Sequence, residues 1–238
     1  MSNPYLKFKS IFREIVSDLS KVISESRVIG LGTGRTVSAF LEVLDEAGVL
    51  RGKRIVTSSI DTAIRVSELG YDVVDTLSIG FIDLYIDSAD KVDVKGNMIK
   101  GGGGALTMEK VLTRNSRYRV FIVDEGKVVK RLCPDYEIPL DVIPNALRIV
   151  MNSLAREGFK VTIRSCNCKR GPAISDVYGA IIDVKPPANL CSDLEKLERY
   201  LDSLPGVITS GLFYKPANRI YVVSEKGYRE LLITSNYK

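Results

Sequence analysis

The sequence predicts an α/β protein that combines a Rossmann-like, mostly parallel sheet domain with a smaller α+β (ferredoxin-like) lid domain. Short apolar runs alternate with amphipathic helical stretches over the first half of the chain, which is typical of a parallel sheet covered by helices on both faces. From about residue 131 the order becomes β-α-β-β-α-β, the order of a ferredoxin-like unit. We therefore expect one domain to comprise 1–130 and 211–238, and a lid or oligomerisation domain to comprise 131–210.

The first domain is predicted to open with a helix over residues 8–23, because apolar side chains recur there at helical spacing. Buried strands and helices then alternate, and the strand at 219–224 is expected to return to the same sheet. The other expected strands are 27–31, 54–58, 71–74, 83–87 and 119–123, and the later helices are 37–44, 62–69 and one beginning near Ala105.

The second domain is predicted to begin with a strand over 137–142. A helix follows, with Pro144 in its first turn and Gly158 beyond its end. The remaining expected elements are strands at 159–163, 178–184 and 207–212, and a helix at 194–204 that Pro205-Gly206 terminates.

The composition excludes several kinds of chemistry. The 238 residues are 45% hydrophobic and 26% charged, as in an ordinary globular protein. The absence of histidine excludes a Ser-His-Asp triad, a His-ligated metal and a His general base. Proton transfer must therefore use carboxylates, Lys, Tyr or Cys. The net charge of +5 suits an anionic small molecule and is too small to indicate nucleic-acid binding.

The cysteines and the apolar runs indicate the compartment. Cys133, Cys166, Cys168 and Cys191 lack the CxxC spacing of a zinc site, so we expect buried free thiols. No apolar run reaches the roughly 18 residues of a membrane span, and the N-terminal residues lack a signal-peptide core. We expect a cytoplasmic protein with no metal or cofactor and no membrane partner.

The first motif is Gly30-Leu-Gly-Thr-Gly-Arg-Thr36, between a predicted strand and helix. Arg35 stands where a dinucleotide fingerprint needs glycine, and the Gly-Lys-Ser/Thr of a P-loop is absent. Glycine amides, hydroxyls and a helix N-terminus together suit a phosphate monoester. The alternative is a tight turn with a threonine cap.

The second motif is Asp87-Ser-Ala-Asp90, at the end of a predicted strand. Two carboxylates at a sheet's carboxyl edge can face one cavity, where mutual repulsion leaves one of them available to carry a proton. The alternative is a solvated acidic turn, because Asp favours turns.

The third motif is Lys100 followed by four glycines and Ala-Leu-Thr-Met-Glu109. Consecutive glycines cost backbone entropy, which favours a close approach of the backbone to a ligand over a simple flexible hinge. The glycines lead into a helix, and we expect Glu109 about two turns from its start, where a solvated helix face is the alternative. The three motifs together favour proton shuttling on a phosphorylated small molecule, with cations stabilising an enediolate.

These segments resemble the A-type ribose-5-phosphate isomerase family over essentially the whole chain. The matching stretches are GLGTGRT, DSADK, KGGGGALTME, PLDVIP and PGVITSGLF. The resemblance implies metal-free interconversion of ribose 5-phosphate and ribulose 5-phosphate in the pentose phosphate pathway. It also implies a Rossmann-like domain with a ferredoxin-like lid, and a homodimer or homotetramer.

The resemblance also implies residue roles. Glu109 would be the base, while Asp87, Asp90 and Lys100 would handle ring opening, hydroxyl protons and enediolate charge. The residues implied to hold substrate or phosphate are Thr33, Gly34, Arg35, Thr36, Ser88, Ala89, Gly101, Gly102, Gly103 and Lys127.

The chain departs from the family pattern at a few positions. Arg35 replaces a usual Ser and either adds a phosphate contact or blocks the loop, and Ser88 replaces a usual Gly and would crowd a turn that needs positive φ. Lys91 replaces a usual Glu, and residues 175–179 replace a TDNGN-like segment. The alternatives to the isomerase are a coenzyme-A transferase that uses a glutamate nucleophile and a non-catalytic sugar-phosphate sensor.

Overall fold

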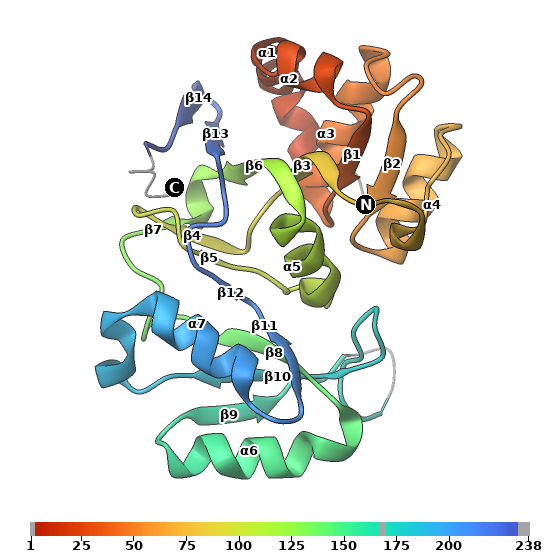
Figure 1. The fold of residues 1–238 in the computed structure, drawn as a ribbon. Helices are drawn as coiled ribbons and strands as arrows, with labels where there is room; N and C mark the ends of the chain where they lie inside the picture. The colour runs from red at the N-terminus through yellow and green to blue at the C-terminus, as the bar shows by residue number, and fades with distance from the viewer. Residues whose placement is uncertain (1–2, 167–169, 233–238) are drawn as a thin grey trace. The chain divides into compact units, whose positions relative to one another are not determined.

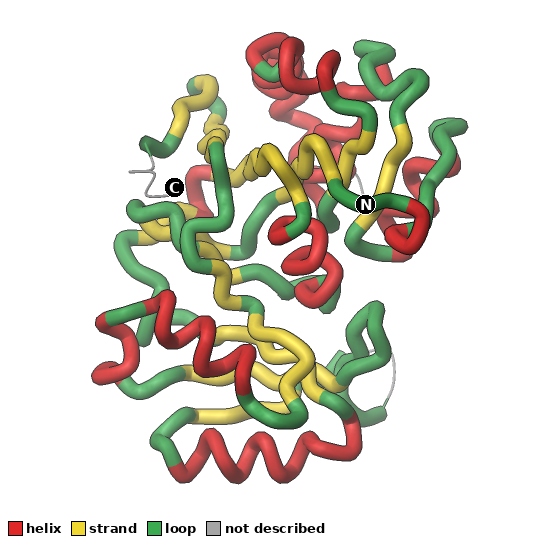
Figure 2. The backbone as a smooth tube through the Cα atoms, viewed as in Figure 1, coloured by secondary structure: helices red, strands yellow, loops and turns green. Residues whose placement is uncertain are grey.

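The chain divides into two compact units. The first consists of Met1–Ser88, Val111–Val128 and Ala217–Lys238, and the second of Ala89–Lys110 and Val129–Pro216. The computed structural model describes residues 3–166 and 170–232. The helices and strands of each unit can be followed in Figure 1 and Figure 2.

A six-stranded sheet forms the centre of the first unit, in the order β14-β13-β6-β3-β1-β2. Every neighbouring pair is parallel except the β13–β14 hairpin, so the mostly parallel sheet and the return of the chain through β13 are confirmed. The strands are β1 (Val28–Leu31), β2 (Arg54–Thr57), β3 (Ile82–Asp87), β6 (Ser116–Asp124), β13 (Arg219–Ser224) and β14 (Gly227–Glu230).

The longer helices of this unit bury apolar side chains against the sheet in one continuous core, to which residues 76–78 and 125–127 contribute none. Phe12 and Phe40, from two of these helices, meet edge to face, with ring centroids 5.4 Å apart. The helices are η1 (Pro4–Phe8), α1 (Lys9–Asp18), α2 (Ser20–Glu25), α3 (Arg35–Glu46), α4 (Ile60–Glu68), η2 (Thr76–Ser78) and η3 (Glu125–Lys127).

Two predicted elements of the first unit differ in the structure. The helix expected over 8–23 is interrupted at the buried Leu19, where the backbone leaves helical geometry. The strand expected over 71–74 is a single bridge between Ile55 and Val73. Pairing ends there because Asp75 caps the short helix η2 by accepting the N–H of Leu77.

Parallel pairing brings the carboxyl ends of three strands to one edge of the sheet. Leu31 of β1 is in register with Thr57 of β2 and with Ile86 of β3. The segments that follow β1 and β2, and Asp87 at the end of β3, therefore adjoin. Ligands of open α/β sheets bind at such an edge.

The second unit contains a four-stranded antiparallel sheet in the order β11-β8-β10-β9. The predicted β-α-β-β-α-β order is confirmed, and both helices pack on one face, in a core shared with alternate residues of β8 and β10. The elements are β8 (Ile138–Val142), η4 (Pro144–Ala146), α6 (Leu147–Arg156), β9 (Lys160–Ile163), β10 (Ala180–Lys185), η5 (Ala188–Ser192), α7 (Leu194–Ser203) and β11 (Val207–Ser210).

A small second sheet explains why the units differ from the predicted domain boundaries. It has the order β12-β5-β4-β7, and Ile99 and Leu212 from its strands enter the core of the second unit. Segments 89–110 and 211–216 therefore group with that unit. The strands are β4 (Lys91–Asp93), β5 (Met98–Ile99), β7 (Val128–Val129) and β12 (Leu212–Phe213), and α5 (Leu106–Arg114) runs from the second unit into the first.

The prediction of free thiols is wrong. Cys133 and Cys191 form a disulfide, with Cα atoms 5.4 Å apart across 58 residues of sequence. Folding places the segment that precedes β8 beside η5, a proximity that sequence spacing does not reveal. Cys166 is also disulfide-bonded, and Cys168 lies outside the described residues.

Candidate functional site

The glycine-rich loop after β1 ends at the N-terminus of α3 without a side-chain cap. Gly34 occupies the cap position with a φ of 107°, a left-handed conformation that favours glycine. The first N–H groups of a helix have no intrahelical partner, so this terminus favours an anion. In the first turn, the hydroxyl of the buried Thr36 has no hydrogen-bond partner. An uncapped terminus with a spare hydroxyl can accept a phosphate.

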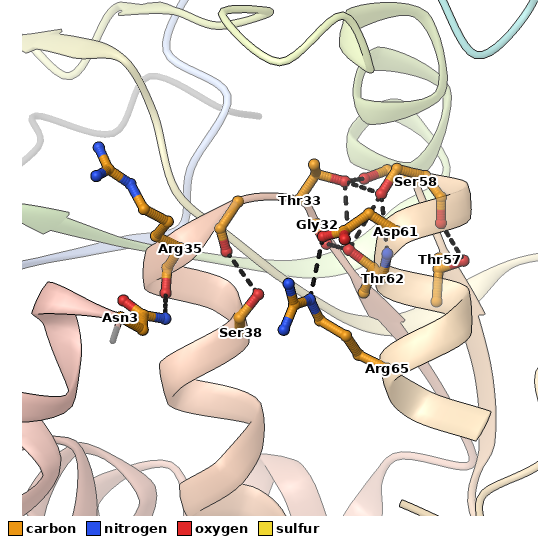
Figure 3. A network of polar contacts seen from close by, with 12 residues as sticks. Asn3, Gly32, Thr33, Arg35, Ser38, Thr57, Ser58, Asp61, Thr62 and Arg65 are labelled. Carbon is orange, nitrogen blue, oxygen red and sulfur yellow. Dashed lines mark hydrogen bonds and ion pairs between the residues drawn. The ribbon is translucent and has the colours of Figure 1, made fainter. Parts of the chain in front are cut away.

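A cluster of hydroxyl groups supports this loop from the neighbouring strand ends (Figure 3). The Thr33 hydroxyl lies 2.9 Å from Ser58 Oγ and donates to Ser59 Oγ at 2.5 Å. The Thr62 hydroxyl donates to the carbonyl of Gly32 at 2.8 Å. Ser58 and Ser59 follow β2 directly, and Thr62 lies in the first turn of α4. The Thr33 hydroxyl therefore contacts the hydroxyls of Ser58 and Ser59, and these contacts help to fix the conformation of the loop.

Asp87 is buried at the end of β3 and organises the same loop. Its carboxylate accepts the N–H groups of Ser88 at 2.7 Å and Thr33 at 3.3 Å, and the Tyr85 hydroxyl at 2.5 Å. A Cβ at Gly32 would lie 1.9 Å from the Asp87 carboxylate, so only glycine fits there. Ser88 does not have positive φ, so its side chain causes no backbone strain in this turn.

Two cations of the first unit lie near the ring of Tyr5. The Arg35 guanidinium carbon is 5.9 Å from the ring centroid and the Lys127 ammonium is 5.6 Å from it. Lys127 also donates to the Ser88 hydroxyl at 3.2 Å. The Arg35 side chain extends away from the hydroxyl cluster in Figure 3, and its carbonyl accepts the amide of Asn3. The Arg35 side chain is exposed.

In the second unit, Lys100 and Glu109 form a buried ion pair. Lys100 Nζ lies 3.2 Å from Glu109 Oε1, and the side chains are 3% and 6% exposed. Glu109 lies in the first turn of α5, nearer the helix start than the predicted two turns. The Lys100 carbonyl lies so close to Gly211 that a Cβ there would be 2.1 Å away. Because the pair is buried, a ligand that displaced either side chain would leave the charge of the other one uncompensated.

The glycine loop between Lys100 and α5 holds Asp90. The N–H of Gly102 donates to Asp90 Oδ2 at 2.7 Å, and a Cβ at Gly102 would lie 2.8 Å from Oδ1. Gly102 and Gly103 are exposed, and Gly101 is buried with a φ of 104°. Ala89 is buried and is the first residue of this unit. The loop thus presents backbone amides and one exposed carboxylate.

The start of α5 is fixed on two sides within the second unit. The Thr107 hydroxyl donates to Asp141 Oδ2 at 2.7 Å, and burial raises the pKa of that carboxyl above its usual range. Lys110 donates to Asp202 Oδ2 at 2.8 Å and to the Leu212 carbonyl at 2.9 Å. Glu109 therefore lies between two anchored residues of one helix.

The predicted site residues fall into two groups, one in each unit. Thr33, Gly34, Arg35, Thr36, Asp87, Ser88 and Lys127 belong to the first, and Ala89, Asp90, Lys100, Gly101, Gly102, Gly103 and Glu109 to the second. Asp87 and Asp90, expected as one carboxylate pair, have separate partners, and one is buried while the other is exposed. Among the described residues, no group of three or more metal-ligating side chains is placed to hold a metal.

Sequence reasoning missed the hydroxyls of Ser58, Ser59 and Thr62. A signal for the two serines existed, because Ser58 ends a predicted strand of a parallel sheet and Ser59 directly follows it, at the edge where ligand-binding groups collect. It also missed Asp141, although a carboxylate between apolar residues of a buried strand is unusual. Within the described part of the chain, no helix is long and apolar enough to cross a membrane.

The comparisons with known proteins agree over nearly the whole chain. The family model of ribose 5-phosphate isomerase A (phosphoriboisomerase A) matches residues 54–227. Ribose-5-phosphate isomerase A of Aeropyrum pernix is 39% identical over 215 residues, 90% of each chain. That of Methanocaldococcus jannaschii is 35% identical over 235 residues, covering 97% of this chain and 99% of the relative.

Solved structures give the same result. The structure of ribose 5-phosphate isomerase A from Methanocaldococcus jannaschii has a TM-score of 0.85 at 33% identity, covering 96% of this chain and 99% of that one. A structure of D-ribose-5-phosphate isomerase in complex with phospho-erythronic acid has a TM-score of 0.86 at 33% identity, covering 97% and 99%.

Proposed function

We propose a role for each site residue on the premise that the chain belongs to the ribose 5-phosphate isomerase A family. As a member, the chain is an isomerase that interconverts ribose 5-phosphate and ribulose 5-phosphate. Glu109 is the base that moves the proton between C2 and C1. The observation that carries this proposal is the buried Lys100–Glu109 ion pair at the end of an exposed glycine loop.

The proton transfer runs through an enediolate. In the open-chain aldose, the Glu109 carboxylate takes the proton from C2, and the electron pair of that bond forms the C1–C2 double bond as the C1 carbonyl oxygen becomes negative. The O2 proton then passes to O1, and Glu109 returns its proton to C1, which leaves the C2 ketone. Lys100, 3.2 Å from the base, is the cation that stabilises the negative oxygen.

The aspartates differ in what supports their proposed roles. Asp90 is exposed and oriented by the Gly102 N–H, which suits proton exchange with sugar hydroxyls during ring opening. Asp87 already accepts three hydrogen bonds within the first unit, which favours a role in holding the phosphate loop. The amides of Gly101, Gly102 and Gly103, with Ala89, contact the reacting end of the sugar.

The phosphate binds at the N-terminus of α3 in this proposal. The uncapped helix end, the Gly34 conformation and the unpartnered Thr36 hydroxyl support that placement. Thr33 shapes the loop, and Lys127, Arg35 and Ser88 supply further contacts.

We also propose that the enzyme is a cytoplasmic homodimer or homotetramer, does not bind nucleic acid and needs no metal. The lack of histidine in the sequence supports the last point, and activity should survive exhaustive chelation.

Glu109→Gln tests the role of the base. The amide keeps the shape of the side chain and removes its basicity, so kcat should fall by about 10²–10⁴-fold while ribose 5-phosphate still binds. Glu137→Gln, at an exposed position of the same unit, is the matched control and should leave kcat unchanged. A Glu109→Gln enzyme within tenfold of wild type would rule out the base, and Asp87 would become the next candidate.

A further inference from the structure

The glycine loop is held by an arginine that lies 63 residues after Gly101 along the chain. Arg164 Nη1 donates to the carbonyl of Gly101 at 2.6 Å and lies 3.4 Å from the carbonyl of Gly102. Its side chain is 20% exposed, and it is the residue directly after β9 in the antiparallel sheet. A side chain of the antiparallel sheet therefore contacts the backbone of the loop that carries the site.

Asp183 fixes the guanidinium in this orientation. Asp183 Oδ2 accepts a hydrogen bond from Arg164 Nε at 2.9 Å, and Asp183 Oδ1 accepts one from Arg164 Nη2. The pair is therefore bidentate. Asp183 is on β10 between Ile182 and Val184, which enter the helix-covered core, so its side chain lies on the opposite face. A bidentate arginine–carboxylate pair has a fixed geometry, which leaves Nη1 directed at the loop.

The direction of these carbonyls decides where the loop amides point. In a planar trans peptide, the carbonyl and the following N–H point in opposite directions. Holding the Gly101 carbonyl on Arg164 therefore turns the Gly102 N–H away from Arg164, onto Asp90 Oδ2 at 2.7 Å. Glycine has little intrinsic preference for one peptide orientation, so an external contact must select it.

We propose that Arg164, oriented by Asp183, is a positioning residue for isomerisation. It sets the orientation of the Gly101–Gly102 peptide and, through the Gly102 N–H, the position of the Asp90 carboxylate. Arg164 itself acts only through the loop. This inference rests on the proposed role of Asp90 and the glycine loop.

Substitution of Arg164 should separate kcat from KM. Arg164→Ala frees the loop peptides, so kcat should fall by about 10²-fold, as is typical of a small misplacement of reacting groups. KM should stay within threefold, because the proposed phosphate contacts belong to the first unit. Arg164→Lys keeps the positive charge but cannot form the bidentate pair with Asp183. Asp183→Asn keeps Arg164 but weakens that pair. Both variants should therefore lose less kcat than Arg164→Ala. Millimolar guanidinium should restore at least tenfold of the kcat lost in Arg164→Ala.

Arg156→Ala is the matched control, an exposed arginine of α6 that should retain wild-type kcat with or without guanidinium. In a double-mutant cycle, the effect of Arg164→Ala should largely vanish in an Asp90→Asn background, because both changes break one chain of contacts. An Arg164→Ala kcat within twofold of wild type, a lost kcat that guanidinium does not restore, or full additivity with Asp90→Asn would overturn the positioning role. An Asp90→Asn enzyme with wild-type kcat would instead overturn the proposed role of Asp90.

Discussion

The two glycine-rich segments of the molecule, 30–36 in the first unit and 100–109 in the second, are held in different ways. The first is held by hydroxyls and a carboxylate from the ends of neighbouring parallel strands and from the first turn of α4. The second contains a buried ion pair and is held by charged side chains that come from far along the chain, Arg164 and Asp141. The proposed roles fit this difference, because backbone and hydroxyl groups suit an anion, whereas charges that transfer a proton must be compensated when they are buried.

The disulfide gives the largest difference expected between the two units, because both of its cysteines belong to the second. Closing a loop across 58 residues stabilises the folded state by about 4 kcal/mol in the chain-entropy model. A Cys133→Ser/Cys191→Ser double variant should therefore unfold at clearly lower urea concentration than the wild type. Unfolding can be followed by circular dichroism.

A reducing agent breaks this disulfide and the one that involves Cys166 in the wild type, but only the latter in the double variant. Reductant should destabilise the wild type much more than the double variant. Equal urea midpoints for the wild type and the double variant would show that the disulfide does not stabilise the second unit.

Two threonines provide a matched test of the comparison. The Thr36 hydroxyl makes no hydrogen bond, so Thr36→Val should leave the unfolding free energy unchanged. If that hydroxyl binds the phosphate, KM should rise by the equivalent of about 1.5–3 kcal/mol, roughly 10- to 150-fold. Thr107→Val removes the donor to a buried carboxylate and should cost about 1–3 kcal/mol of stability. A Thr36→Val enzyme with normal KM and reduced stability would show that the Thr36 hydroxyl stabilises the fold and does not bind the phosphate.

Arg35 is expected to have a smaller effect than Thr36, because it is exposed and its interaction with the phosphate is screened by salt. Arg35→Ala should raise KM severalfold at low ionic strength, and the difference should shrink as salt is added. Steady-state kinetics across a salt series measures this. A lower KM in the variant would show that Arg35 obstructs the loop.

Asp141 gives the smallest expected effect, which depends on pH. Burial raises the pKa of this carboxyl in the folded state, so the folded protein binds the proton more tightly than the unfolded chain does. Its contribution to stability is fully present below the unfolded pKa of about 3.9 and is lost as pH rises through the folded value. The stability of Asp141→Asn relative to wild type should therefore improve between pH 4 and pH 7. Urea unfolding at several pH values tests this, and a constant difference would contradict it.

The difference between the segments also explains how much the sequence could predict. The loop after β1 and the position of Asp87 follow from strand–turn–helix patterning and from the parallel sheet, because both depend on local order and on a common edge. The support of the second segment depends on contacts such as Arg164 with Gly101 and Thr107 with Asp141, which join residues 63 and 34 positions apart. No local pattern encodes those contacts. The Cys133–Cys191 disulfide was missed for the same reason.

The position of Glu109 shows a related limit. The sequence correctly places it on the helix that follows the glycines, but the helix begins at Leu106, so Glu109 is in the first turn. Four glycines leave the start of a helix undetermined by propensity, and the hydrogen bond of Thr107 to Asp141 holds that start in the folded protein. Helix existence was predictable here, whereas the register that brings Glu109 to Lys100 was not.

Solvent isotope exchange at C2 tests most directly whether Glu109 moves the proton. Wild-type enzyme incubated with ribose 5-phosphate in deuterated water should introduce deuterium at C2 of the recovered aldose, because the proton on the base exchanges before it returns. Glu109→Gln should bind ribose 5-phosphate and introduce deuterium at least about 10²-fold more slowly. Exchange by Glu109→Gln at a rate within tenfold of wild type would contradict the assignment of Glu109 as the base.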